Sequence, residues 1–202
     1  MKNKNIFSRF VKVTVFIGGI LAMSGCILKL IIPAPERTFL PQDLLLTTED
    51  LSSTWSVAFG PQKVGDNTKP KNSMEIALIK SIDSKINSDR KWDVMERVYR
   101  FTSVEGAKED YSVTTTFPGK TNPDGWTYIS GLADEQKISC YTYSNMEYPV
   151  CRWVARYEEI VIEVIAWLNP NRINIEDFQD LVIKIDEKVI SYLSENGPPL
   201  TN

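Results

Sequence analysis

The cysteine at position 26 ends the sequence LAMSGC, in which small residues directly precede the thiol. Four basic residues lie within residues 2–12, and residues 13–23 form an apolar run. A basic start, a short apolar core and small residues before a cysteine are typical of a lipoprotein signal peptide. The pattern predicts that residues 1–25 are removed and that Cys26 carries a lipid. That lipid would hold the chain at a membrane of the cell envelope, on its extracytoplasmic side.

An uncleaved membrane anchor is the alternative interpretation of the same segment. Residues 10–32 are mostly apolar, with Lys12 and Lys29 near their ends. About 20 apolar residues suffice to span a bilayer. In the preferred interpretation residues 26–37 comprise the lipidated cysteine and a tether, and both interpretations place the rest of the chain outside the cytoplasm.

Two further cysteines, Cys140 and Cys151, are expected to form a disulfide bond, because an even pair in an exported chain is the usual sign of one. Residues 138–143 and 151–157 are rich in β-branched and aromatic residues, with the turn-like stretch 144–149 between them. A hairpin centred in that turn places Cys140 directly opposite Cys151, within reach of a disulfide. Two reduced, buried thiols are the alternative.

A third strand is predicted over residues 160–167, after a tight turn that places Tyr157 opposite Ile160. Because side chains alternate along a strand, this register divides three strands between two faces. One face is apolar and is expected to lie in the core; it carries Ile138, Cys140, Trp153, Ala155, Tyr157, Ile160, Ile162 and Val164. The other face is mixed; it carries Tyr141, Tyr143, Arg152, Val154, Arg156, Val161, Glu163 and Ile165.

The mixed face supplies the candidate ligand-binding residues, which are Tyr141, Tyr143, Arg152, Arg156 and Glu163. Guanidinium groups bind carboxylates and phosphates, and tyrosine rings provide rigid contact area. Arg152 and Arg156 are expected to flank Glu163 diagonally. The alternatives are a solvent-facing surface whose ion pairs contribute little, or a surface covered by a helix.

Two amphipathic helices are expected beside these strands. The clearer one follows Asn174, a good N-cap, and carries an apolar stripe at helical spacing. The other is expected over residues 103–115, with Thr102 and Glu105 forming a capping box.

A short helix near residues 48–52 and strands over 55–59, 74–82 and 94–101 complete the prediction. The predicted fold class is α+β, with a mainly antiparallel sheet of about five to seven strands packed by two helices, the C-terminal one longest. A single folded domain is expected at 38–195, followed by a flexible tail at 196–202.

The composition excludes several kinds of chemistry. The chain has no histidine, which excludes His-dependent triads and His-based zinc sites. Losing four basic residues with the signal peptide lowers the formal charge from −3 to −7, which disfavours nucleic acid as a partner. There is no glycine-rich phosphate loop, and the acidic stretch 83–93 lacks the spacing of a calcium loop. We therefore expect no metal, no cofactor and no enzymatic activity, with Glu158 and Glu159 in a solvated turn.

The sequence CRWVARY at 151–157, preceded by Cys140 and followed by IVIEV at 160–164 and a C-terminal helix, resembles exported sensor-type domains. Such domains occur in actinobacterial lipoproteins and in the extracellular part of PknH-type receptor kinases. The early LLLT at 44–47 fits the same order. The resemblance implies an antiparallel sheet packed with helices around a ligand-binding cleft. Those domains commonly carry two disulfides, whereas this chain can form only one.

Three functional hypotheses follow. The first is a non-catalytic, sensor-like envelope domain that binds an unknown small ligand or an envelope protein. The second is a structural or scaffolding envelope protein that interacts with another protein. The third and least favoured is a His-free, carboxylate-based hydrolase.

Overall fold

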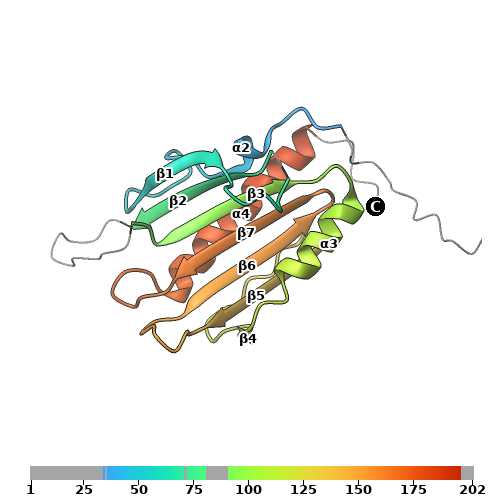
Figure 1. Ribbon diagram of the computed structural model, residues 1–202. Helices are drawn as coiled ribbons and strands as arrows, with labels where there is room; N and C mark the ends of the chain where they lie inside the picture. Colours follow the sequence, from blue (N-terminus) through green and yellow to red (C-terminus); the bar gives the residue numbers. More distant parts are fainter. Residues whose placement is uncertain (1–33, 35, 71, 81–90, 197–202) are drawn as a thin grey trace, which may run out of the picture. The chain divides into compact units, whose positions relative to one another are not determined.

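The computed structural model describes residues 34, 36–70, 72–80 and 91–196, which fold around one antiparallel sheet (Figure 1). Within this part of the chain seven strands lie in the order β1-β2-β3-β7-β6-β5-β4. The strands are β1 (Trp55–Lys63), β2 (Met74–Lys80), β3 (Val94–Arg100), β4 (Lys120–Thr121), β5 (Glu135–Tyr141), β6 (Val150–Tyr157) and β7 (Ile160–Trp167). The helices are α2 (Pro41–Leu44), α3 (Val104–Thr114) and α4 (Ile175–Asn196). The predicted α+β class, with a C-terminal helix that is the longest of the three, is confirmed.

Helix α4 packs along one face of the sheet, which we call the inner face (Figure 1). Its apolar stripe is buried there; it comprises Phe178, Leu181, Val182, Ile185 and Val189. The Oδ1 atom of Asn174 accepts a hydrogen bond from the Asp177 N–H at 2.8 Å, as expected of an N-cap. The predicted core face of β5, β6 and β7 lies against this helix and is confirmed.

Helix α3 covers part of the opposite face, which we call the outer face (Figure 1). Its Ala107 packs in a small buried cluster with Val154 and Val161. The predicted N-cap at Thr102 is wrong, because the Oγ of Ser103 accepts the N–H of Gly106 at 3.1 Å. The carbonyl of Thr102 instead accepts a hydrogen bond from the N–H of Ala34 at 3.0 Å.

The predicted hairpin registers are both confirmed. Cys140 lies directly opposite Cys151 in the β5–β6 pair, and the two are joined by a disulfide across a Cα–Cα distance of 4.0 Å. Tyr157 lies opposite Ile160, with a two-residue turn between them. The registers fix which side chains of β5, β6 and β7 point to the outer face.

The short helix was predicted at the wrong place. Pro41 starts α2 instead, where its fixed φ suits the first helical turn, and Asp43 accepts the Leu40 N–H at 2.7 Å. Residues 48–50 form a turn, in which the Asp50 carboxylate accepts the N–H of Thr47 at 2.6 Å.

No helix within the described residues is long and apolar enough to cross a membrane. The predicted signal peptide, the alternative anchor at 10–32 and Cys26 all lie outside the described residues. The same holds for most of the predicted tail, at 197–202, and for the end of the strand predicted over 74–82.

Candidate functional site

A row of polar side chains crosses the outer face of the sheet, one from each of four neighbouring strands. Gln62 lies opposite Glu75, Glu75 opposite Arg97, and Arg97 opposite Glu163. The Gln62 amide and the Arg97 Nε each donate to Glu75 at 2.9 Å, and an Arg97 amino group lies 3.5 Å from Glu163. Strand order therefore aligns an alternating set of donors and acceptors, which we call the polar row.

Glu163 is the most buried member of the polar row. Its carboxylate accepts a hydrogen bond from the Tyr99 hydroxyl at 2.7 Å and forms an ion pair with Arg152 of the adjacent strand β6. Burial first, and the charge of Glu163 second, raise the pKa of Tyr99 well above its ordinary value, so the hydroxyl remains a donor. Glu163 is thus held between two arginines and a tyrosine, an arrangement that fixes all four side chains.

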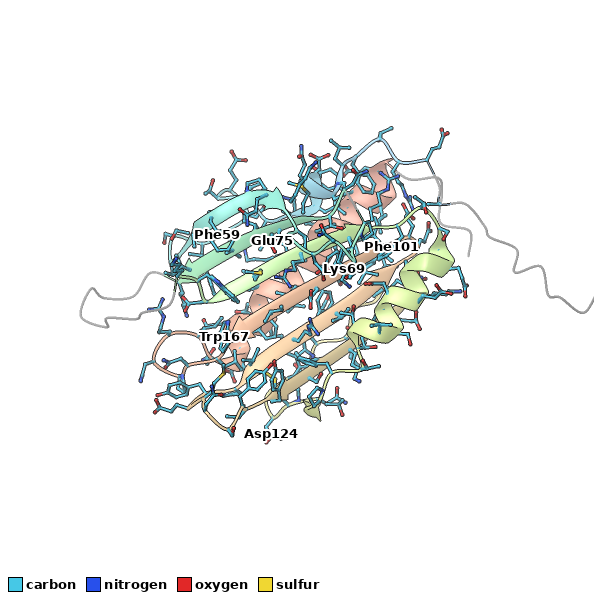
Figure 2. The ribbon with its side chains drawn as sticks, viewed as in Figure 1. Phe59, Lys69, Glu75, Phe101, Asp124 and Trp167 are labelled. Carbon is cyan, nitrogen blue, oxygen red and sulfur yellow. A yellow bond between two sulfur atoms is a disulfide. The ribbon has the colours of Figure 1, made fainter. Side chains whose placement is uncertain are left out.

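A pocket of about 370 Å³ opens above the polar row. We call it the outer pocket; it is lined by Val64, Gly65, Asp66, Lys69, Glu75, Arg97, Tyr99, Arg152 and Glu163. Strands β2, β3, β6 and β7 supply its floor, and the loop between β1 and β2 supplies one wall. Figure 2 shows Lys69 and Glu75 on the face of the sheet that also carries α3.

Lys69 fastens the β1–β2 loop to helix α3. Its ammonium group donates to Asp110 at 2.5 Å and to the Thr114 hydroxyl at 3.1 Å, and it lies 4.7 Å from the centre of the Tyr99 ring. Within the loop, Asp66 accepts the Thr68 N–H at 2.8 Å, which makes a local turn. The β1–β2 loop, which forms this wall of the pocket, is therefore held by its own turn and by the contact of Lys69 with α3.

Arg152 forms the opposite side of the pocket. It donates to the Thr114 carbonyl at 3.3 Å, and its guanidinium lies 4.6 Å from the centre of the Phe117 ring. Its Nε is buried and has no hydrogen-bond partner among the described residues. A buried donor without an acceptor costs free energy, and because this atom is covered it is not offered to a ligand in the pocket.

The structure brings two of the five predicted ligand-binding residues, Arg152 and Glu163, into the outer pocket. Tyr141 and Tyr143 lie beside it rather than in its lining. The centre of the Tyr141 ring is 4.6 Å from that of Phe117 and 4.4 Å from that of Tyr143, in edge-to-face contacts that continue from the Phe117 ring beside Arg152. Burial, together with the hydrogen bond to Tyr143, raises the pKa of Tyr141 to about 12.

Arg156 occupies the predicted position diagonal to Glu163, but its guanidinium forms its ion pairs with other acids. Glu135 lies directly opposite it in the β5–β6 pair and accepts a hydrogen bond from its Nε at 2.6 Å. Its NH1 donates to Asp134 at 2.7 Å. Two acids on the β5 side therefore turn this guanidinium away from β7.

Lys69, Glu75, Arg97 and Tyr99 were not among the predicted site residues. Glu75 and Arg97 break the apolar pattern of β2 and β3, which is the one signal in the sequence that marks them. Recognising the site would also have required the strand order, because it is the pairing of β3 with β7 that brings Arg97 to Glu163.

The turn between β6 and β7 is not the solvated turn that we predicted. Glu159 is fully buried, and its carboxylate accepts a hydrogen bond from the Nε of Arg37 at 3.1 Å. Arg37 also donates to Glu158 at 2.5 Å. The guanidinium of Arg37, rather than water, therefore contacts the carboxylates of this turn.

Two further carboxylates are buried on the inner side. Glu96 accepts the Leu46 N–H at 3.0 Å, its second oxygen has no hydrogen-bond partner among the described residues, and burial raises its pKa to about 8. Asp186 accepts hydrogen bonds from Tyr128, Tyr157 and Ser130. Neither side chain is part of the lining of the outer pocket.

Two other pockets border α4, and each is lined by charged side chains that are partly exposed. One, of about 610 Å³, contains the pair Lys188–Asp50, and the other, of about 380 Å³, contains the pair Lys80–Asp177. The outer pocket differs because two of its acids, Glu75 and Glu163, are buried beside their arginines, and buried charges are retained only where their partners are fixed. Fixed polar groups are what a specific ligand site requires, so the outer pocket is the candidate functional site.

Among the described residues, no group of three or more His, Cys, Asp or Glu side chains is placed to hold a metal ion. Comparisons with protein-family models, with curated proteins and with solved structures find no match to this chain. The outer pocket is therefore interpreted from its own geometry.

Proposed function

We propose that this protein is an exported lipoprotein whose folded part binds a small polar ligand in the outer pocket. The single observation that carries the ligand-binding proposal is the convergence of Arg97 and Arg152 on the buried carboxylate of Glu163, at the floor of a pocket. Each guanidinium is held by Glu163 and by a second acceptor, which leaves its orientation fixed before a ligand arrives. Pre-organised donors bind a polar ligand without the entropic cost of ordering them.

Binding rather than catalysis is favoured by the residue types in the pocket lining. The lining contains no Ser, Thr or Cys that could act as a nucleophile, and the chain contains no His that could act as a base. Its two buried acids, Glu75 and Glu163, are both engaged by Arg97.

Export and lipid anchoring are supported by the sequence and by one structural feature. The LAMSGC sequence places Cys26 where a lipoprotein carries its lipid. The Cys140–Cys151 disulfide is of a kind that persists in oxidising compartments outside the cytoplasm. In this proposal the lipid holds the domain at the membrane, on the extracytoplasmic side of the cell envelope.

The anchoring is tested by the intact mass of the protein extracted from membranes of the native host. We expect the mass of a chain that begins at Cys26 and carries acyl groups, and we expect a Cys26→Ala variant to be absent from the membrane fraction. A membrane protein that retains residues 1–25 without acyl groups would show the uncleaved anchor instead.

The ligand site is tested by thermal unfolding of the detergent-solubilised protein with a library of small polar metabolites. At least one compound is expected to raise the midpoint, and Arg152→Gln is expected to remove that rise. Lys108→Gln, which changes an exposed cation on α3, is the matched control and should keep it. The midpoint of each variant without ligand reports whether it folds, and Arg97→Lys provides a second variant of the same site. If no compound shifts the midpoint, the ligand-binding proposal is wrong.

A further inference from the structure

The charges around the outer pocket are arranged in two levels. At the floor the arginine side chains remain partly accessible, with exposed fractions of 27% for Arg97 and 22% for Arg152. The acids beside them are covered, at 9% for Glu75 and 2% for Glu163. A ligand that reaches the floor therefore meets mainly guanidinium donors, which match a carboxylate in geometry and charge.

The rim of the outer pocket carries an accessible negative charge, whereas the accessible charges at its floor are positive. Asp66 is exposed in the β1–β2 loop, and its hydrogen bonds from Thr68 lower its pKa, so the side chain is ionised at neutral pH. The neighbouring cation, Lys69, is already engaged by Asp110 and covered by contact with the Tyr99 ring. The most accessible charge at the rim is thus a carboxylate, which attracts an ammonium group.

The lining as a whole is neutral, with three basic and three acidic side chains. A multiply charged anion would bring negative charge that nothing in the lining balances, and its carboxylates or phosphates would also meet Asp66. An uncharged sugar would form no ionic contact with the partly exposed arginines at the floor or with the exposed carboxylate of Asp66. A molecule with one negative and one positive end complements both the arginines at the floor and Asp66 at the rim.

We propose that the outer pocket takes a small zwitterion, a free amino acid or a dipeptide, and this inference rests on the proposed ligand-binding function. The carboxylate lies on the partly exposed side chains of Arg97 and Arg152, and the ammonium group lies toward Asp66. A volume of about 370 Å³ is at the small end of the range for ligand pockets and accommodates a molecule of this size.

The experiment is calorimetric titration of the detergent-solubilised full protein. The probes are the common amino acids and alanylalanine, compared with N-acetylalanine, ethylamine, inorganic phosphate and glucose. At least one zwitterion is expected to bind. N-acetylalanine, which lacks the ammonium group, and ethylamine, which lacks the carboxylate, are expected to bind at least about tenfold more weakly.

Variants of the rim separate this inference from a general affinity for carboxylates. Asp66→Asn retains an oxygen that can accept from Thr68, so the loop should keep its turn. It is expected to weaken zwitterion binding about tenfold while leaving N-acetylalanine unaffected. Glu49→Gln, an exposed acid bordering a pocket at α4, is the matched control and should leave both affinities unchanged.

Each remaining outcome counts against the inference. If phosphate or glucose binds and Arg152→Gln abolishes that binding, the zwitterion class is wrong while the outer pocket remains the ligand site. Equal affinity for alanine and N-acetylalanine would mean that the rim does not select an ammonium group. If none of the probes binds, the inference fails, and a negative result with the metabolite library would then remove the proposed function as well.

Discussion

The side chain of Arg37 is completely buried against the carboxylate of Glu159, which lies 122 residues further along the chain. Nearby, the N–H of Ala34 donates to the carbonyl of Thr102, and Phe39 is buried in the core. The segment that leads into the folded domain is therefore attached to the β6–β7 turn and to the start of α3 before α2 begins. Its polar contacts are with charged and backbone groups that the local sequence does not reveal.

Replacing Arg37 with alanine should lower the free energy of unfolding by about 3–5 kcal/mol, because it leaves the buried Glu159 without its nearest cation. Urea unfolding followed by circular dichroism measures the change. Arg37→Ala combined with Glu159→Gln should recover part of the loss, since the uncompensated charge is then removed. A loss of less than 1 kcal/mol in the single variant would show that Arg100, 3.7 Å from Glu159, suffices as its partner.

Glu96 should make the protein less stable as the pH rises. Burial raises its pKa from the ordinary value of 4.5 to about 8 in the folded chain. Between these two values the folded chain retains a proton that the unfolded chain has lost. The stability that this proton provides is complete below pH 4.5 and is lost as the pH rises toward 8.

The test is the difference in unfolding free energy between wild type and Glu96→Gln, measured at several pH values from 5 to 8. The variant should gain on the wild type by up to about 1.4 kcal/mol per pH unit over this range. Glu49→Gln, whose side chain is exposed, should follow the wild type throughout. Parallel curves for wild type and Glu96→Gln would show that Glu96 is ionised in the folded chain at neutral pH.

The parts of this structure that could be predicted from the sequence are those that depend on neighbours along the chain. Cys140 and Cys151 are 11 residues apart, so the turn between them determines their register. Alternation then assigned Trp153 and Ile162 correctly to the core. The cap of α3 was misplaced by one residue because Thr102 and Ser103 are both good cap residues, and the structure uses Ser103.

The candidate site could be predicted only in part, because it is built across strands that are distant in sequence. Arg152 and Glu163 lie on adjacent hairpin strands and were found together. Arg97 reaches Glu163 only because β7 is inserted between β3 and β6, which no local pattern indicates. Lys69 joins the site through a loop contact with Asp110, a side chain on α3.

A methyl group at Gly119 should destabilise the β4–β5 end of the sheet. The backbone there has a φ of +140°, and an added Cβ would lie 2.6 Å from the carbonyl oxygen of Cys140. Gly119→Ala is expected to cost about 1–3 kcal/mol, because neither the backbone conformation nor the carbonyl can easily yield. Gly131→Ala is the matched control, since no atom lies within 4 Å of its added Cβ. Equal stability of the two variants in urea unfolding would contradict the close approach of Gly119 to Cys140.

Reduction of the Cys140–Cys151 disulfide should lower stability without abolishing ligand binding. The bond closes a loop of 11 residues, and the chain-entropy model gives about 3 kcal/mol for a loop of that size. Arg152 follows Cys151 directly, but its guanidinium is held by Glu163 and Thr114, which the loss of the bond leaves in place. Unfolding midpoints with and without reductant measure the first effect, and titration of the Cys140→Ala, Cys151→Ala double variant measures the second. Loss of affinity in a double variant that still folds would show that the disulfide, rather than the polar row, positions Arg152.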